Sequence, residues 1–248
     1  MQRSRVLSAV LIVLGLYMPS LSNALKGGKF DDQIQQDVQK QIQSKKEFKD
    51  VTASVDDQVV TVTGSVPLYI DLVNLEKRVK KVKNVEAVRN HVTVSSTVPD
   101  SELQEKLASK LRYDRVGYGN VFNAIGLQVQ NGVVTLTGNV HDYPSRDSAI
   151  AIAETQPGVK DVIDNIEVAP VSNFDDELRT RLYRAIYGDT VLSRYAMDPQ
   201  KPIRIVVDNG HVTLYGAVSS ALDKQLAGTR ANGVSGVFSV DNQLVVAQ

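Results

Sequence analysis

The sequence contains no cysteine and no tryptophan, and only 6% of its 248 residues are aromatic. The absence of cysteine excludes disulfide bonds, catalytic thiolates and acylation of a cysteine at an N-terminal cleavage point. Neither charge sign dominates, because 28 basic residues balance 28 acidic residues. Nucleic-acid binding depends strongly on positive charge, so we expect no nucleic-acid partner.

The chain also lacks a hydrophobic run long enough to span a bilayer, for which about 18 to 20 apolar residues are needed. Its most apolar stretch, Val6 to Leu16, follows Arg3 and Arg5 and precedes small residues that end at Ala24. This order is typical of a secretory signal peptide. We therefore predict a signal peptide over residues 1–24, cleavage after Ala24, and a periplasmic or secreted protein without a transmembrane span.

No pattern typical of catalysis or metal binding is present. The three histidines, His91, His141 and His211, have no neighbouring histidine, cysteine or glutamate at the spacing of metal ligands. The sequence has no Gly-x-Ser-x-Gly motif, no phosphate-loop lysine and no evident pair of catalytic carboxylates. We predict no catalytic residue, no metal site, no cofactor and no enzymatic activity.

What the chain does contain is one motif repeated three times. The ten residues from Asn131 to Val140 have counterparts at residues 57–66, 74 positions earlier, and at residues 209–218, 78 positions later. A fixed motif recurring at such intervals indicates repeated structural units. We predict three repeats, and in the rest of the text they are repeat one (residues 25–96), repeat two (97–170) and repeat three (171–248).

Each repeat is expected to fold as an α-β-β-α-β unit. Apolar residues alternate on both sides of Asn131-Gly132, which predicts two half-buried strands joined by a two-residue turn. Before them, Asp100 precedes Leu103, Leu107 and Leu111, a spacing that predicts an amphipathic helix with an acidic cap. A second helix and a third alternating strand follow. The predicted class is α+β, with three tandem units that each have a three-stranded mixed sheet and two helices on one face.

A glycine occupies an inward position near the end of each hairpin motif, at Gly64, Gly138 and Gly216. The missing Cβ allows another backbone to approach the sheet closely, so we expect a helix to cross there. A phosphate-binding role is not indicated, because the lysine and the strand-to-helix context of such loops are absent. We assign these three residues as structural glycines.

A short polar residue recurs on the inward side of each third strand, at Asn90, Asp164 and Asn242. Such a residue can contact a ligand, but side chains of this kind more often accept or donate hydrogen bonds to nearby backbone. We favour hydrogen bonding to backbone over ligand binding for these three residues.

The order of these motifs resembles the BON domain (bacterial OsmY and nodulation). The resemblance rests on a hairpin that ends in glycine, an alanine-rich helix, and the sequences Gly158-Val159-Lys160-Asp161-Val162 and Gly236-Val237-Phe238-Ser239-Val240. Repeat one departs from the pattern, with Asn84 in place of that glycine. The resemblance implies an envelope or periplasmic location, binding of phospholipid or of a macromolecule, and no enzymatic activity.

The second helix of repeat one has a feature that the other repeats lack. A step of 100° per residue places Ile70, Val73, Lys77, Lys80 and Lys81 on the side opposite its core positions. Near an anionic membrane each lysine contributes on the order of 1 kcal/mol, and the two apolar residues can enter the headgroup boundary. These five residues are the candidate lipid-binding site. In the alternative interpretation, Ile70 and Val73 pack on repeat two and the lysines are solvated.

A second candidate lies on the long segment between the first helix and the hairpin of repeat two. It contains Arg112, Tyr113, Arg115, Tyr118 and Phe122. These side chains can stack on a sugar or a headgroup, or they can form an interface between repeats. Units of about 70 residues bury little core alone, which favours the interface.

Together these observations predict an exported, non-enzymatic binding protein of the cell envelope with anionic phospholipid as its ligand. Two alternatives remain open. A periplasmic stress-protective protein would hold client proteins on exposed apolar surface, and an envelope scaffold would contact cell wall or secretion machinery through the aromatic segment.

Overall fold

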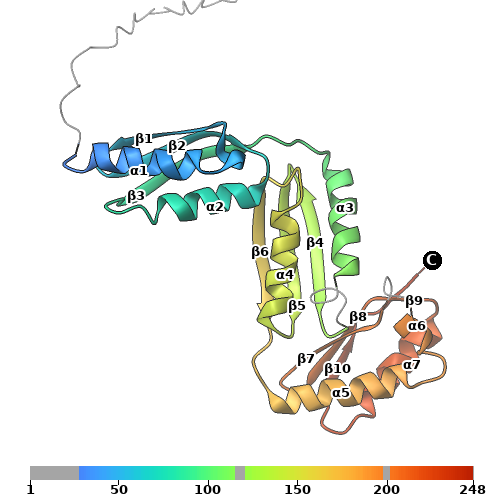
Figure 1. The fold of residues 1–248 in the computed structure, drawn as a ribbon. Helices are drawn as coiled ribbons and strands as arrows, with labels where there is room; N and C mark the ends of the chain where they lie inside the picture. The colour runs from blue at the N-terminus through green and yellow to red at the C-terminus, as the bar shows by residue number, and fades with distance from the viewer. Residues whose placement is uncertain (1–27, 115–120, 198–201, 248) are drawn as a thin grey trace, which may run out of the picture.

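The structure, a computed structural model, describes residues 28–114, 121–197 and 202–247. The predicted signal peptide, residues 1–24, lies outside the described residues. Three units follow one another along the chain, and Figure 1 shows repeat one at one end of repeat two and repeat three at the opposite end.

All three repeats share the order helix, strand, strand, helix, strand, with a few short additional elements in repeats one and three. Repeat one comprises α1 (Asp31–Gln43), a short 3-10 helix (Lys46–Phe48), β1 (Val51–Asp56), β2 (Val59–Val66), α2 (Tyr69–Val79) and β3 (Ala87–Val94). Repeat two comprises α3 (Asp100–Tyr113), β4 (Ala124–Gln130), β5 (Val133–Val140), α4 (Tyr143–Glu154) and β6 (Asp161–Val168). Repeat three comprises α5 (Asn173–Tyr187), α6 (Arg194–Met197), β7 (Arg204–Asp208), β8 (His211–Tyr215), β9 (Ala217–Val218), α7 (Ala221–Asn232), β10 (Ser239–Asn242) and β11 (Val245–Val246).

The middle strand of each sheet is the second strand of the hairpin. In repeat one, β2 is antiparallel to β1 and parallel to β3. The other two repeats have the same arrangement around β5 and β8. The predicted α-β-β-α-β order and mixed sheet are therefore confirmed, and the place of the third strand, which the sequence did not determine, is beside the second.

Both helices of a repeat pack on the same face of its sheet. In repeat one, α1 contributes Ile34, Val38 and Ile42 to the same core cluster as Leu75 and Val79 of α2. Apolar residues recur every four positions on α1 and every second position on β2, so on each element they share the side that faces the core. The corresponding positions on the second helices of the other repeats are alanines, and all of them are buried: Ala149, Ala153, Ala227 and Ala231.

The hairpins have the predicted register. Val129 pairs with Val134 and Leu127 with Leu136, and repeats one and three show the corresponding pairs. Asp57 and Gln58, which replace Asn-Gly in repeat one, have φ values of 48° and 63°. They therefore adopt the same left-handed turn as Asn131-Gly132, at a cost in backbone strain that glycine would not incur.

The aspartate at the start of each first helix binds the turn of its own hairpin, a contact that we name the hairpin clamp. Asp31 accepts hydrogen bonds from the N–H groups of Asp57 and Gln58, both at 2.9 Å. The bonds in the other repeats join Asp100 to Asn131 and Gly132 (2.5 and 2.8 Å), and Asp175 to Asn209 and Gly210 (both 2.9 Å). The sequence predicted only a helix cap, but the two N–H groups of a two-residue turn also need partners.

The hairpin clamp predicts a specific dependence of stability on pH. The N–H of Gln58, followed by those of Gly28 and Asp57, holds the pKa of Asp31 below its usual value, although burial opposes this. A lowered folded-state pKa gives stability that is present above the unfolded pKa of about 4 and is lost as pH falls through the folded pKa. We expect the urea midpoint of Asp31→Asn to fall less than that of wild type between about pH 5 and pH 3. Equal losses in the two proteins would contradict this role of Asp31.

The expectation that a helix crosses at the inward glycines is wrong. Gly64, Gly138 and Gly216 have φ values of 118°, 98° and 125°. A Cβ on Gly138 would lie 2.0 Å from the carbonyl oxygen of Ala124, and one on Gly64 would lie 2.0 Å from that of Asp50. The close backbone thus belongs to the neighbouring strand or to the segment that leads into it, and the left-handed φ independently favours glycine.

Repeat three differs from the other two in its sheet. The predicted continuous third strand is divided into β10 and β11, and the second strand is divided at Gly216 into β8 and β9. The N–H of Gln243 donates to Leu214 O and the N–H of Val245 to Gly216 O, both at 2.9 Å. These bonds carry the strand pairing across the interruption.

The recurring polar residue of the third strand bonds to backbone, as we favoured. Asn90 Oδ1 accepts from the N–H of Val92 at 3.0 Å, two residues along its own strand. Asp164 and Asn242 make the equivalent bonds to Ile166 and Leu244. Each of the three also contacts its second helix, through Glu76, Arg146 and the carbonyl oxygen of Lys224. These side chains fasten the second helix to the third strand.

Candidate functional site

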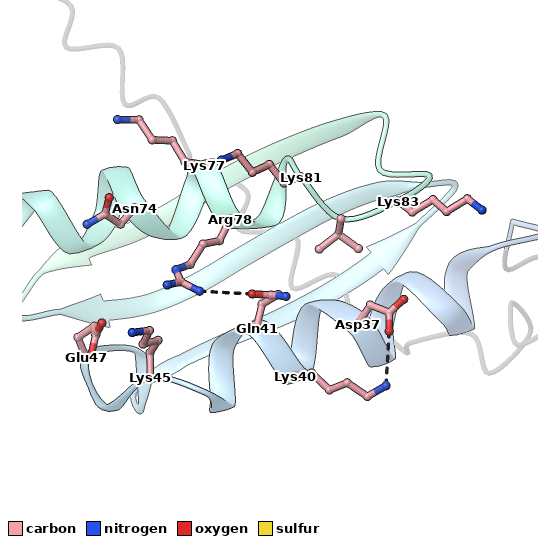
Figure 2. Close-up of a pocket in the computed structure, with 11 residues that line it drawn as sticks. Asp37, Lys40, Gln41, Lys45, Glu47, Asn74, Lys77, Arg78, Lys81 and Lys83 are labelled. Atoms are coloured by element: carbon pink, nitrogen blue, oxygen red, sulfur yellow. Dashed lines mark hydrogen bonds and ion pairs between the residues drawn. The ribbon is translucent and has the colours of Figure 1, made fainter.

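A groove with a volume of about 770 Å³ lies between α1 and α2 of repeat one. We name it the basic groove (Figure 2). Its walls come from α1, from the segment that follows α1, and from the second half of α2 with the turn beyond it. The lining residues are Asp37, Lys40, Gln41, Lys45, Glu47, Asn74, Lys77, Arg78, Lys81, Val82 and Lys83.

The basic groove carries a clear excess of positive charge. Six of its lining residues are lysine or arginine and two are acidic, so the lining has an excess of four positive charges. Lys40 lies 3.5 Å from Asp37, and Arg78 donates to Gln41 Oε1 at 3.4 Å across the groove. Lys45, Lys81 and Lys83 are exposed to solvent. Several cations around one concave surface attract a multiply charged anion or a charged surface.

The structure divides the five candidate lipid-binding residues. Lys77 and Lys81 line the basic groove, but Lys80 is not among its lining residues. Instead, Lys80 Nζ lies 2.5 Å from Glu76 Oε1, and Glu76 Oε2 in turn lies 3.4 Å from Asn90 of β3. The hydrogen bond from Lys80 lowers the pKa of Glu76. Lys80 thus takes part in a local ion pair, whereas its neighbour Lys81 lines the groove.

The start of α2 lies at the boundary with repeat two. Tyr69 packs against the core of repeat two. Burial, and after it a hydrogen bond with Asp161, raises the pKa of the Tyr69 hydroxyl to about 12. Ile70 and Val73 are half-buried. Tyr69 thus places the start of α2 against repeat two, whereas Lys77 and Lys81 of its second half and the turn beyond line the basic groove. Packing of Ile70 and Val73 on repeat two stays a prediction.

An electrostatic interaction between α2 and α4 accompanies Tyr69 at this boundary. Burial raises the pKa of Glu154, which lies at the end of α4, and Lys77 of α2 acts on it in the opposite direction. Val98, between β3 and α3, lies beside Gly158, where an added Cβ would be 2.7 Å from the valine side chain. Repeat one thus covers the hairpin-turn end of repeat two through the start of α2 (Figure 1).

The second candidate segment lies between repeats two and three. Phe122 and Val121 pack against the core cluster of repeat three, and the Phe122 ring meets that of Tyr183 edge to face at 6.4 Å. The N–H of Ile205 donates to Val121 O at 2.8 Å. Phe122 therefore lies at an interface between repeats two and three, the arrangement that the interface interpretation describes.

Of the other four members of this segment, the structure describes only Arg112 and Tyr113. Arg112 is half-buried near the end of α3, and Tyr113 is 64% exposed. Arg115 and Tyr118 lie outside the described residues. A common ligand site of all five stays a prediction.

The described residues contain neither a metal-binding cluster nor a membrane-spanning helix. Within residues 28–114, 121–197 and 202–247, no group of three or more His, Cys, Asp or Glu side chains is arranged to hold a metal ion. In the same part of the chain, no helix combines the length and apolar character needed to cross a membrane.

The three units, each with helix, hairpin, helix and parallel third strand, define a tandem-repeat α+β protein. Comparison with known families gives the BON domain at residues 30–96, 99–170 and 175–248, so the chain belongs to the BON domain family. The resemblance seen in the sequence is thereby confirmed. A search of the curated proteins gives no match.

Two solved structures resemble the chain weakly. CdsD, a structural protein of the type III secretion system of Chlamydia trachomatis, is 17% identical over 87% of this chain and 92% of its own, with a TM-score of 0.25. The C-terminal domain of CdsD is 15% identical over 86% of this chain and 96% of its own, with a TM-score of 0.26. At these values the likeness bears on neither the function nor the partners of this chain.

Proposed function

We propose that this BON protein is an exported, non-enzymatic binding protein of the cell envelope and that repeat one binds the surface of anionic phospholipid membranes. The observation that carries the proposal is the basic groove, where six cationic side chains from two helices surround one concave surface with only two carboxylates. The predicted signal peptide supports export, and family membership supports a role in the envelope.

Electrostatic attraction suits a peripheral and reversible contact of this kind. Each lysine or arginine near an anionic membrane contributes on the order of 1 kcal/mol, so several together give substantial binding without an inserted helix. The groove gathers cations that are 43 positions apart in the sequence, from Lys40 to Lys83. A headgroup phosphate in the groove would contact both helices at once, which a single helical stripe cannot provide.

Removing two groove charges should weaken binding to anionic vesicles. Lys45 and Lys81 contribute to the groove from the segment after α1 and from the end of α2. Because each contributes on the order of 1 kcal/mol, we expect Lys45→Gln with Lys81→Gln to reduce vesicle affinity at least about tenfold. Flotation with phosphatidylcholine vesicles, with and without phosphatidylglycerol, measures this. Raising salt from about 0.1 to 1 M, which shortens the Debye length from about 10 to 3 Å, should weaken wild-type binding as well.

Two controls separate the groove from general charge effects. Lys106→Gln with Lys110→Gln removes the same charge from exposed positions of α3 and should leave binding nearly unchanged. Lys80→Gln should have a smaller effect than Lys81→Gln, because only Lys81 lines the groove. Wild-type protein that does not float with anionic vesicles at low salt would refute the proposal. Suppression of client aggregation by that same protein would then favour the stress-protective alternative.

A further inference from the structure

Repeat three presents two stacked aromatic rings to solvent at its hairpin-turn end. Phe174 of α5 and Phe238, just before β10, have ring centroids 6.1 Å apart and planes 22° apart. His211 meets Phe238 edge to face at 6.0 Å. Phe238 is 70% exposed and Phe174 43% exposed. We name Phe174, Phe238 and His211 the aromatic end of repeat three.

The corresponding end of repeat two is covered by another BON unit. Asp161 at the start of β6, which is hydrogen-bonded to Tyr69 of repeat one, corresponds to Ser239 at the start of β10, 78 positions later. Gly158 is lined by Val98 of its own repeat, and its counterpart Gly236 by Phe174 and Arg181 of repeat three, so this part of the end is built alike in both repeats. In this fold the hairpin-turn end is therefore a surface on which the start of a second helix from another unit can dock.

The chain also carries an unused counterpart of the docking tyrosine. Tyr143, at the start of α4, lies 74 positions after Tyr69 and occupies the same place in its repeat. It is 64% exposed, so within one chain it does not cover the aromatic end of repeat three. One molecule thus has a free docking tyrosine and a free receiving end.

We propose that the aromatic end of repeat three is a self-association surface that receives Tyr143 of a second copy of this chain. In the closed form of this association, two copies each place Tyr143 on the aromatic end of the other, so the contact occurs twice about a twofold axis. Burial of three aromatic rings at each contact, in edge-to-face or offset arrangements, stabilises the association. This contact between two molecules would resemble the one by which repeat one docks on repeat two within a single molecule.

Sedimentation velocity over a range of protein concentrations tests the proposal. Wild type should form a dimer whose fraction rises with concentration, and Phe238→Lys should shift the dissociation constant at least tenfold toward monomer. The fold should tolerate this replacement, because Lys160 is the counterpart of Phe238 in repeat two. The aliphatic part of Lys160 packs on Gly132 as the Phe238 ring packs on Gly210. Tyr143→Ser should have the same effect. Val171→Ser, at a residue 99% exposed between β6 and α5, should have none.

Engineered cysteines give a second test, because the chain has none of its own. Ala151 and Asn232 are the counterparts of Lys77 and Glu154, whose charges interact where repeat one docks on repeat two. Oxidation of a mixture of Ala151→Cys and Asn232→Cys proteins should give a disulfide-linked pair that contains one of each. Wild type that stays monomeric at every concentration, oligomers that grow beyond two copies, or a mixture that forms no mixed pair would each overturn the proposal.

Discussion

Replacing Asp175 by alanine is expected to lower the free energy of unfolding of repeat three by about 3 kcal/mol, because hydrogen bonds to a charged group contribute roughly 1.5 to 3 kcal/mol each. Asp175 is 1% exposed and accepts bonds from the N–H groups of Asn209 and Gly210. The alanine variant leaves both turn N–H groups without this partner, and that of Gly210 is buried. Amide hydrogen exchange, followed by mass spectrometry on peptides from repeat three, measures the loss locally.

Two further variants show whether the carboxylate itself is responsible. Asp175→Asn keeps the shape of the side chain but offers one acceptor and one donor, so about half of the loss is expected. Glu177→Ala removes an exposed carboxylate from the same turn of α5 and should cost little. If repeat three exchanges equally fast in Asp175→Ala and Glu177→Ala, the clamp does not stabilise the hairpin. Peptides of repeat one should be unaffected in all three variants, since each repeat has its own clamp.

The sequence predicted well those features that follow from short-range periodicity. Strand pairs such as Val129 with Val134 follow from alternation on both sides of a two-residue turn, because a shift by one residue would turn every apolar side chain outward. The helical stripe Ile34, Val38 and Ile42 is equally constrained, since it must meet the sheet to be buried. Repetition of each pattern in three copies removed most of the ambiguity that one copy would leave.

The hairpin clamp was missed because its partners are far apart in the sequence. Asp100 lies 31 positions before Asn131, and an aspartate at a helix start already has a sufficient local explanation as a cap. The recurrence of the aspartate at a fixed place in all three repeats was visible. What the sequence alone could not supply was the packing angle that brings the helix start over the turn.

The candidate site was predicted in part for similar reasons. Lys77 and Lys81 were identified from α2 alone, but Lys40 and Lys45 became part of the groove only when α1 packed beside α2. Lys80 was grouped with them by helical angle. Its partner Glu76 stands four residues earlier, which is the favourable spacing and order for an ion pair on a helix. That local signal could have separated Lys80 from the groove residues.

Replacing Gly138 by alanine is expected to destabilise repeat two by about 3 kcal/mol, since a non-glycine residue in a sparsely populated backbone region costs roughly 1 to 3 kcal/mol and overpacking adds a similar amount. The φ of Gly138 is 98°, and the new Cβ would lie 2.0 Å from the carbonyl oxygen of Ala124. Because that oxygen belongs to backbone, relief requires β4 to move away from β5. Hydrogen exchange of β4 and β5 peptides and thermal unfolding both report the change.

Gly126→Ala is the matched control, because Gly126 lies on the same pair of strands and its φ is not in the left-handed region. An added Cβ there would lie 2.5 Å from Thr137 Oγ1, the end of a side chain that can rotate away. Alanine also restricts the unfolded chain more than glycine does, so a change below about 1 kcal/mol of either sign is expected. If both variants lose the same stability, glycine at position 138 is not required by its φ or by the carbonyl oxygen of Ala124. A large loss confined to Gly138→Ala would extend the same requirement to Gly64 and Gly216, whose φ values are also positive.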